Sequence, residues 1–131
     1  MSEEHLDLDG FVAAVTALPE VGETTTWGHR AWAVAGRKFA WVRPLTKADQ
    51  ERFRAADPPV EAPTGPLVAL VTEDLGEKAA VLAEERPGFF DIEHFARFAG
   101  YLVALDAARA DDVRDALTAA WQAKAPARLR P

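Results

Sequence analysis

Cysteine is absent from the 131 residues of this chain, and other marks of common chemistry are missing with it. Without thiols the chain has no disulfide, cysteine zinc site, iron–sulfur cluster or thiolate nucleophile. The only serine is Ser2, beside the start of the chain, so a serine nucleophile is not expected. The glycine-rich phosphate loop, the dinucleotide-binding fingerprint and the nucleophile elbow of hydrolases are absent too. The residues therefore predict a protein that is not an enzyme.

Long hydrophobic runs are also missing. No apolar stretch approaches the ~20 residues that a membrane-spanning helix requires, and the acidic start is unlike a secretory signal. Hydrophobic residues make up 49% of the chain and charged residues 27%, which is typical of a soluble globular protein. We therefore expect a cytoplasmic protein with no membrane partner, folded as a single domain over residues 1–131.

The histidines and acidic pairs show no metal-ligating pattern. No two of the three histidines have the i, i+2 or i, i+4 spacing that places ligands on one face; they are His5, His29 and His94. The acidic pairs stand at expected helix edges or turns, where carboxylates act as caps. The sequence thus predicts neither a metal nor a cofactor.

Charge is distributed unevenly along the chain, whose net charge is −6. Residues 27–54 contain seven basic residues against two acidic ones, a local charge of +5, while the remainder carries eight against nineteen, or −11. This segment either faces an anionic partner or pairs with the acidic remainder. The candidate nucleic-acid-binding residues within it are Arg37, Lys38, Arg43, Lys47 and Arg54.

Hydrophobic periodicity predicts helices and strands that follow one another in a mixed order. Helices are expected from residue 8 to 18, over 47–56 and 75–85, and around 113–121. Strands are expected over 24–27, 31–35, 38–42, 67–71 and 101–105, with a further extended segment at 89–94. Residues 57–66, with four prolines, form a loop. Tight turns between successive strands favour an α+β two-layer sandwich, with a mainly antiparallel sheet and helices on one face.

Aromatic and basic residues alternate in the strand at 38–42. Strict alternation places Arg37, Phe39, Trp41 and Arg43 on one face, as in a stacking platform for single-stranded nucleic acid or an aromatic ligand. The alternative is that Phe39 and Trp41 belong to the core, with the arginines reaching water. The candidate ligand-binding residues of the whole chain are Trp27, His29, Phe39, Trp41 and His94.

Several short motifs together resemble one known family. They are Trp27-Gly28, residues 36–41, residues 87–90 with His94, and Ala120-Trp121. Over residues 8–126 they resemble the MmcQ/YjbR family, and residues 41–44 resemble its actinobacterial-type members. The resemblance implies an α-β(3)-α-β(2)-α fold similar to that of secretion chaperones, with an added helix at 75–85. It implies no agreed catalytic residue.

The family's usual description, DNA-binding, supplies the leading functional expectation. With no base-reading helix in evidence, we expect only weak, non-specific binding to DNA. The alternative is a protein-interaction or small-ligand-binding module on the same fold, including a homodimer. A contiguous basic surface around residues 37–54 favours the first hypothesis, and a surface of mixed sign favours the second.

Overall fold

The computed structural model describes residues 4–130 and confirms the expected α+β class. Its elements, in chain order, are α1 (Leu8–Thr16), β1 (Val21–Thr26), β2 (His29–Val34), β3 (Arg37–Val42), α2 (Lys47–Ala55), β4 (Leu67–Val71), α3 (Leu75–Ala83), β5 (Phe89–Phe90), the short 3-10 helix η1 (Glu93–Phe95), β6 (Gly100–Ala104), α4 (Ala110–Lys124) and the 3-10 helix η2 (Ala127–Leu129). Within residues 4–130, no helix is long and apolar enough to span a bilayer.

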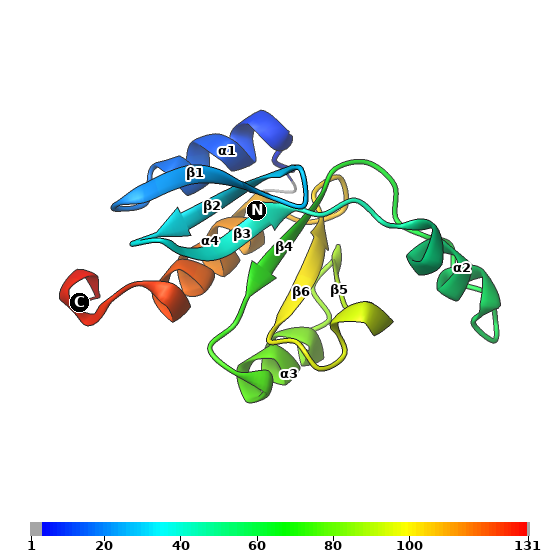
Figure 1. The fold of residues 1–131 in the computed structure, drawn as a ribbon. Helices are drawn as coiled ribbons and strands as arrows, with labels where there is room; N and C mark the ends of the chain where they lie inside the picture. Colours follow the sequence, from blue (N-terminus) through cyan, green and yellow to red (C-terminus); the bar gives the residue numbers. More distant parts are fainter. Residues whose placement is uncertain (1–3, 131) are drawn as a thin grey trace.

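The six strands form one antiparallel sheet in the order β1-β2-β3-β4-β6-β5. Helix α4 packs on β3 and β4, and α1 packs on β1 and α4, so both cover the same face (Figure 1). The main core between these helices and the sheet contains the buried rings of Phe11, Trp32, Phe39 and Tyr101 and the indole of Trp121. Burial of these rings is the main source of stability in a domain of this size.

Side-chain caps stabilise the starts of the first two helices. The carboxylate of Asp7 accepts a hydrogen bond from the backbone N–H of Gly10 at the start of α1. At the start of α2, Thr46 and Asp49 form a reciprocal capping box. Each cap satisfies backbone donors that have no partner within the helix.

The two hairpins of the sheet turn through the same backbone geometry. Trp27 and Gly28 have φ angles of 51° and 78°, and Ala35 and Gly36 have φ angles of 49° and 79°. Two successive positive φ angles are the signature of a type I′ turn, which matches the twist of the flanking strands. The first strand is longer than expected, beginning at Val21, and Trp27 belongs to the turn rather than to a strand.

The opposite face of the sheet carries a second, smaller cluster. Ala69 of β4 and Leu102 of β6 point away from α4 and pack with Ile92 and Phe95. The expected extended segment at 89–94 pairs with the sheet only at Phe89 and Phe90, and then turns into η1. This short segment brings aromatic side chains onto the face that the long helices leave open.

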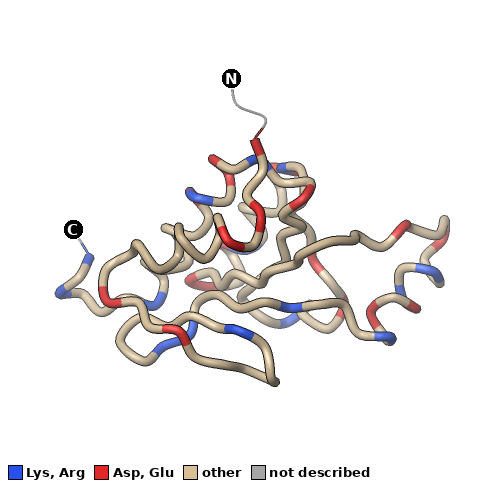
Figure 2. The backbone as a smooth tube through the Cα atoms, turned by 90° about the horizontal axis from the view of Figure 1, so that it is seen from above, with Lys and Arg blue, Asp and Glu red and all other residues tan. Residues whose placement is uncertain are grey.

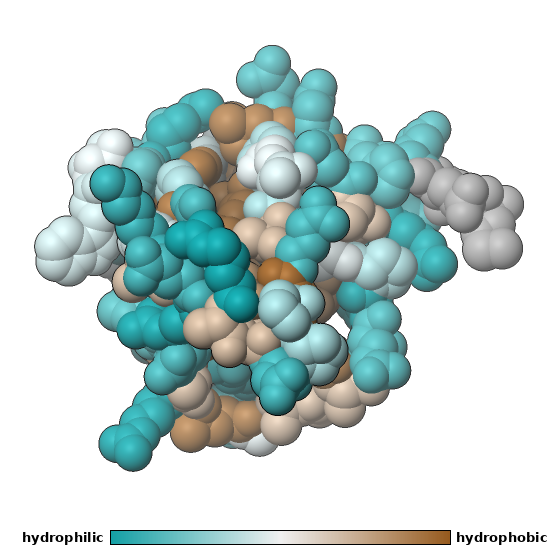
Figure 3. All heavy atoms as spheres, turned by 90° about the vertical axis from the view of Figure 1, so that its right-hand side faces the viewer, coloured by the Kyte–Doolittle hydropathy of each residue, from teal (hydrophilic) through white to brown (hydrophobic). Residues whose placement is uncertain are grey.

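Helix α2 lies to one side of the sheet, between the short connection 43–46 and the longer connection 56–66 (Figure 1). It packs on η1 rather than on β3. Figure 3 looks at the molecule from this side and shows mainly hydrophilic side chains, with separate apolar patches between them. This position matters for the charge distribution described below.

A bulge in β3 interrupts the alternation of side chains that the sequence predicts. Trp32 of β2 pairs with Ala40, but the next residue of β2 pairs with Lys38, so Phe39 is an additional residue in β3. Such an insertion reverses which face the following side chains point to. Phe39 therefore faces α4 and the main core, whereas Trp41 contacts the second cluster. The prediction that Phe39 and Trp41 share a face is wrong.

Candidate functional site

A groove of about 570 Å³ lies along β3 and is bordered by the β1–β2 turn, residues 94–98 and the end of α4. One end is lined by the β1–β2 turn, with Trp27 and His29, and by Arg43 at the end of β3. The other end is lined by Lys38 at the start of β3 and by Lys124 at the end of α4. Lys38 and Arg43 are five residues apart on one strand, which makes the groove roughly 15 Å long.

Aromatic rings form the floor of this groove. The ring of Trp41 lies 6.4 Å from that of Phe95 and 6.0 Å from that of Phe98, and these two phenylalanine rings are 5.2 Å apart. His94 tilts against Phe95 at 6.0 Å. The planes are tilted or edge-on, the geometries that aromatic quadrupoles favour. The result is an apolar surface built of mutually inclined rings.

The groove's charged side chains are all basic. Lys38 and Lys124 form no ion pair within residues 4–130. The guanidinium carbon of Arg43 lies 5.5 Å from the centre of the Phe95 ring, a cation–π contact. Among the described lining residues there is no aspartate or glutamate. An acidic protein thus keeps a carboxylate-free groove with cations at both ends, which favours an anionic ligand.

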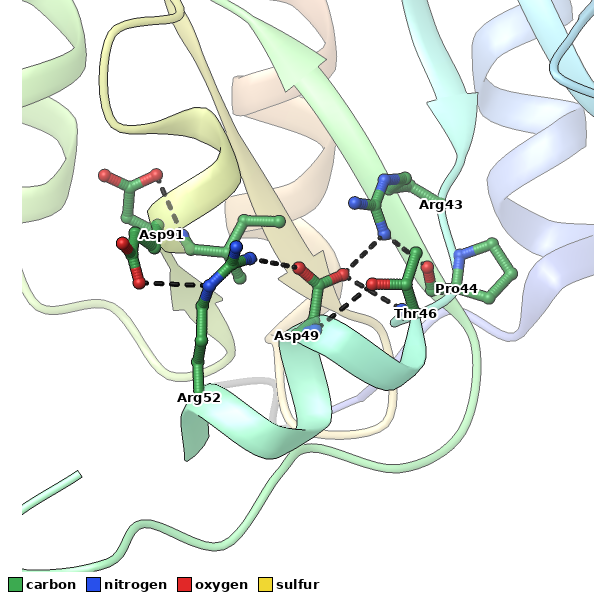
Figure 4. Close-up of polar contacts among 8 residues, drawn as sticks. Arg43, Pro44, Thr46, Asp49, Arg52 and Asp91 are labelled. Atoms are coloured by element: carbon green, nitrogen blue, oxygen red, sulfur yellow. Dashed lines mark hydrogen bonds and ion pairs between the residues drawn. The ribbon is translucent and has the colours of Figure 1, made fainter. Parts of the chain in front are cut away.

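Arg43 is held in place by a buried carboxylate. Its guanidinium donates to Oδ2 of Asp49 at 3.0 Å and to the carbonyl oxygen of Pro44 (Figure 4). Burial disfavours the charge on Asp49, yet the backbone N–H of Thr46, the Arg43 guanidinium and the Thr46 hydroxyl outweigh it. The pKa of Asp49 therefore lies below its ordinary value. Asp49 thus remains ionised and orients Arg43 at the edge of the groove.

The same carboxylate connects the groove to a second hollow of about 290 Å³ beneath α2. Arg52 lies 3.6 Å from Oδ1 of Asp49 and 3.0 Å from the carboxylate of Glu93, the residue before His94. The described residues of this hollow include three acids and a single arginine. Its mixed charge does not indicate a ligand of one sign.

The aromatic wall of the groove is anchored by a buried lysine of α3. The ammonium of Lys78 donates to the carbonyl oxygens of Phe95, at 2.6 Å, and Phe98, at 2.9 Å. It also lies 3.1 Å from Oδ1 of Asp91. Three acceptors thus satisfy all three donors of the ammonium, and segment 91–98 is fastened to α3.

The structure brings together four of the five predicted ligand-binding residues. Trp27, His29, Trp41 and His94 all line the groove, although they come from three separate parts of the chain. Phe39 is the exception, because the bulge of β3 turns it into the main core, where its side chain is fully buried. Its assignment to a ligand site is therefore corrected.

The five predicted nucleic-acid-binding residues do not form one surface. Only Lys38 and Arg43 line the groove. Arg37 points to the other face, where its guanidinium donates to the carbonyl oxygen of Lys124. Lys47 and Arg54 belong to α2, which lies apart from β3. The prediction that Arg37 and Arg43 share a strand face is wrong, for the same reason as for Phe39.

Most arginines of the basic segment pair with carboxylates. Besides the pairs of Arg43 and Arg52, Arg30 binds Glu23 at 2.8 Å and Arg54 lies 3.9 Å from Glu51. Figure 2 shows basic and acidic residues side by side along α2. The surface around residues 37–54 is therefore of mixed sign. Of four cavities formed by residues 4–130, only the groove has no carboxylate among its lining residues.

Among the groove residues that the sequence-based prediction missed, three are aromatic or charged: Phe95, Phe98 and Lys124. Phe95 and Phe98 follow Phe89 and Phe90 within ten residues, and this local density of aromatics is a signal that was available. Lys124 offers no such signal, since a basic residue in the last turn of a helix is ordinary. Within residues 4–130, no group of three or more histidines and acids is close enough to hold a metal.

Comparison with known proteins identifies relatives in mycobacteria. Over 98 residues the chain is 35% identical to the uncharacterized proteins Rv2570 and MT2646 of Mycobacterium tuberculosis and Mb2600 of Mycobacterium bovis. The match covers 75% of this chain and 74% of each relative. No family model matches the chain, and no solved structure matches it. The chain belongs to the same family as these three uncharacterized mycobacterial proteins.

Proposed function

We propose that this chain is a non-catalytic binding domain whose groove takes a nucleotide unit, either free or within a single strand of nucleic acid. One observation supports this most directly: an aromatic floor lies between basic residues and the groove has no carboxylate among its described lining residues. A nucleotide matches both features, since it joins a flat ring to a phosphate group. Other anions without a ring would leave the aromatic floor in contact with water.

The binding energy would come from two separate contacts. A base stacking on the Trp41 floor is worth about 1–3 kcal/mol in proteins that bind single strands. The phosphates would be neutralised by Lys38 and Lys124, which form no ion pair within residues 4–130, whereas Arg43 is already paired with Asp49. We expect a Kd of ~10⁻⁴–10⁻⁶ M, the range of non-specific binding.

Duplex DNA fits the structure less well than a single strand. A duplex presents one negative charge per ~1.7 Å of its axis and requires a broad basic surface. Here the arginines of the segment are largely paired, and α2 lies apart from β3. In a duplex the bases are also stacked on one another and out of reach of the groove floor.

We also propose that the family to which the chain belongs is the MmcQ/YjbR family. The observed order has a first helix, three strands, a helix and further strands before a last helix, with α3 as the added helix. Apart from the two-residue strand β5, this is the order that the sequence resemblance implies. A nucleotide-binding domain of this kind fits the cytoplasmic location expected from the sequence and requires no cofactor.

The test is a binding titration followed by fluorescence anisotropy. Labelled single and double strands of about 12 nucleotides are titrated at several salt concentrations, and unlabelled mononucleotides and pyrophosphate are used as competitors. The single strand should bind more tightly than the duplex, and its affinity should fall with salt by about 0.7 per phosphate contact in the log–log slope. Displacement of the strand by a mononucleotide would show that a free nucleotide is sufficient to occupy the groove.

Variants distinguish the groove from general charge attraction. Lys38→Ala and Lys124→Ala should each weaken binding and lower the salt slope. Lys47→Ala removes the same charge from α2, outside the groove, and should change neither. If the wild type bound no probe at about 50 mM salt and 100 μM protein, or bound the duplex best, the proposal would fail.

A second candidate function, self-association, is favoured by the edge strand β1. This strand is six residues long, has no proline and is exposed at four central positions. Long exposed edges pair readily with another strand, and two copies of β1 would pair antiparallel about a two-fold axis. Sedimentation of the wild type and of Thr25→Pro tests this, because Thr25 forms a non-hydrogen-bonded pair with Arg30 and its N–H points to the free edge. A wild type that remains monomeric at high concentration contradicts it.

A further inference from the structure

The two type I′ turns of the sheet provide a comparison within one molecule. Trp27-Gly28 and Ala35-Gly36 have φ angles that agree within 2° at both positions. The first position of such a turn lies in the left-handed region, which favours asparagine, aspartate or glycine and strains a bulky side chain. Alanine at position 35 shows that a turn of this kind forms without a bulky side chain at its first central position. Tryptophan at position 27 is therefore unexplained by turn formation.

Packing does not explain Trp27 either. Its side chain is 93% exposed, the highest value among the large hydrophobic residues of the described chain. The other three tryptophans are buried or half-buried, as expected for the largest apolar side chain. Trp27 thus combines a strained backbone, which lowers the stability of the unbound protein, with a hydrated indole that gains nothing from burial.

The β1–β2 turn places the side chain of Trp27 at the groove. Trp27 lines the groove together with His29, Arg43 and His94. Its indole is free to rotate about two side-chain torsions, because nothing packs against it. The turn and Trp41 line the same groove, so a ligand ring stacked on Trp41 would lie close to the turn.

We propose that Trp27 is the ring-contacting residue of the groove, and that it covers the base of the bound nucleotide from the side opposite the Trp41 floor. This inference rests on the proposed function and adds to it a residue that acts on the ring of the ligand rather than on its phosphate. The residue at this turn would then lower the stability of the free protein and raise its affinity for the nucleotide. This pattern is expected where binding and stability compete.

The test replaces each turn residue with the one that a type I′ turn favours. Trp27→Asn and its matched control Ala35→Asn should both raise Tm, by about 2–4 °C, because asparagine relieves the same strain in both turns. Only Trp27→Asn should weaken binding of AMP and of a labelled thymidine strand, by about 5-fold or more. Its affinity for pyrophosphate, which has no ring, should equal that of the wild type.

Each outcome decides the question. Equal nucleotide affinity of Trp27→Asn and the wild type overturns the inference and leaves the proposed function standing. An equal loss for nucleotide and pyrophosphate also overturns it, since the effect would then not concern the ring. A wild type that binds no nucleotide removes the proposed function, and the inference with it.

Discussion

The guanidinium of Arg43 donates a hydrogen bond of 3.0 Å to Oδ2 of Asp49, and this contact joins the groove to helix α2. The carboxylate is 2% exposed and the guanidinium side chain 15%. A pair this well shielded is less screened by solvent than the ion pairs on the surface of α2. It is therefore the ion pair whose loss is expected to matter most.

Replacing Asp49 with asparagine should destabilise the protein by about 2–3 kcal/mol. The change leaves Arg43 without its charged partner and weakens the capping box of α2. Chemical denaturation measures the difference. Glu51→Gln removes an exposed partner of Arg54 from the same helix and should change stability by less than about 0.5 kcal/mol. Similar losses for both variants would contradict the special role of Asp49.

The stabilisation by Asp49 should depend on pH in a defined direction. Its pKa is lower in the folded protein than its ordinary value, so the unfolded state binds the proton more readily. The stabilisation is therefore complete above about pH 5 and is lost as pH falls below about 4, through the folded pKa. The difference in unfolding free energy between wild type and Asp49→Asn should narrow over that range. A constant difference from about pH 7 to pH 2 would contradict this.

Two tryptophans with opposite exposure should respond differently to truncation. Trp121 is 4% exposed, packs in the main core and donates from Nε1 to the carbonyl oxygen of Pro19 at 3.0 Å. Trp121→Ala should cost about 3–5 kcal/mol through the cavity that it leaves. Trp27→Ala should cost nothing, since the ring is exposed and Ala35 adopts the same backbone geometry. A loss under about 1 kcal/mol for Trp121→Ala would contradict the role of its ring in the main core.

Removing the buried ammonium of Lys78 should loosen the aromatic wall of the groove. Lys78→Met keeps the length of the side chain but leaves the carbonyl oxygens of Phe95 and Phe98 without their donor. We expect a loss of about 2–4 kcal/mol and faster amide hydrogen exchange over residues 91–98. Lys47→Met, at an exposed position of α2, is the matched control. Unchanged exchange in segment 91–98 would mean that other contacts hold the wall.

Local sequence determined most of the secondary structure. The apolar periods, the caps at Asp7 and Thr46, and the glycines of both hairpins act within a few residues, so they are readable along the chain. The strand at Leu67–Val71 was predicted with its observed bounds. Six groove residues were also predicted, four as ligand-binding and two as nucleic-acid-binding, because clusters of aromatic, histidine and basic residues are recognisable along the chain.

Only the tertiary structure decided which of these side chains meet. The bulge at Phe39 depends on how β2 and β3 pair, and it turns Phe39 into the core while Trp41 and Arg43 face the groove. The pairing of Arg43 with Asp49, and the arrival of Lys124 from α4, join residues whose separation along the chain carries no signal. Strand register and ion pairing are set by the packing of the whole sheet, and a local pattern does not contain that information.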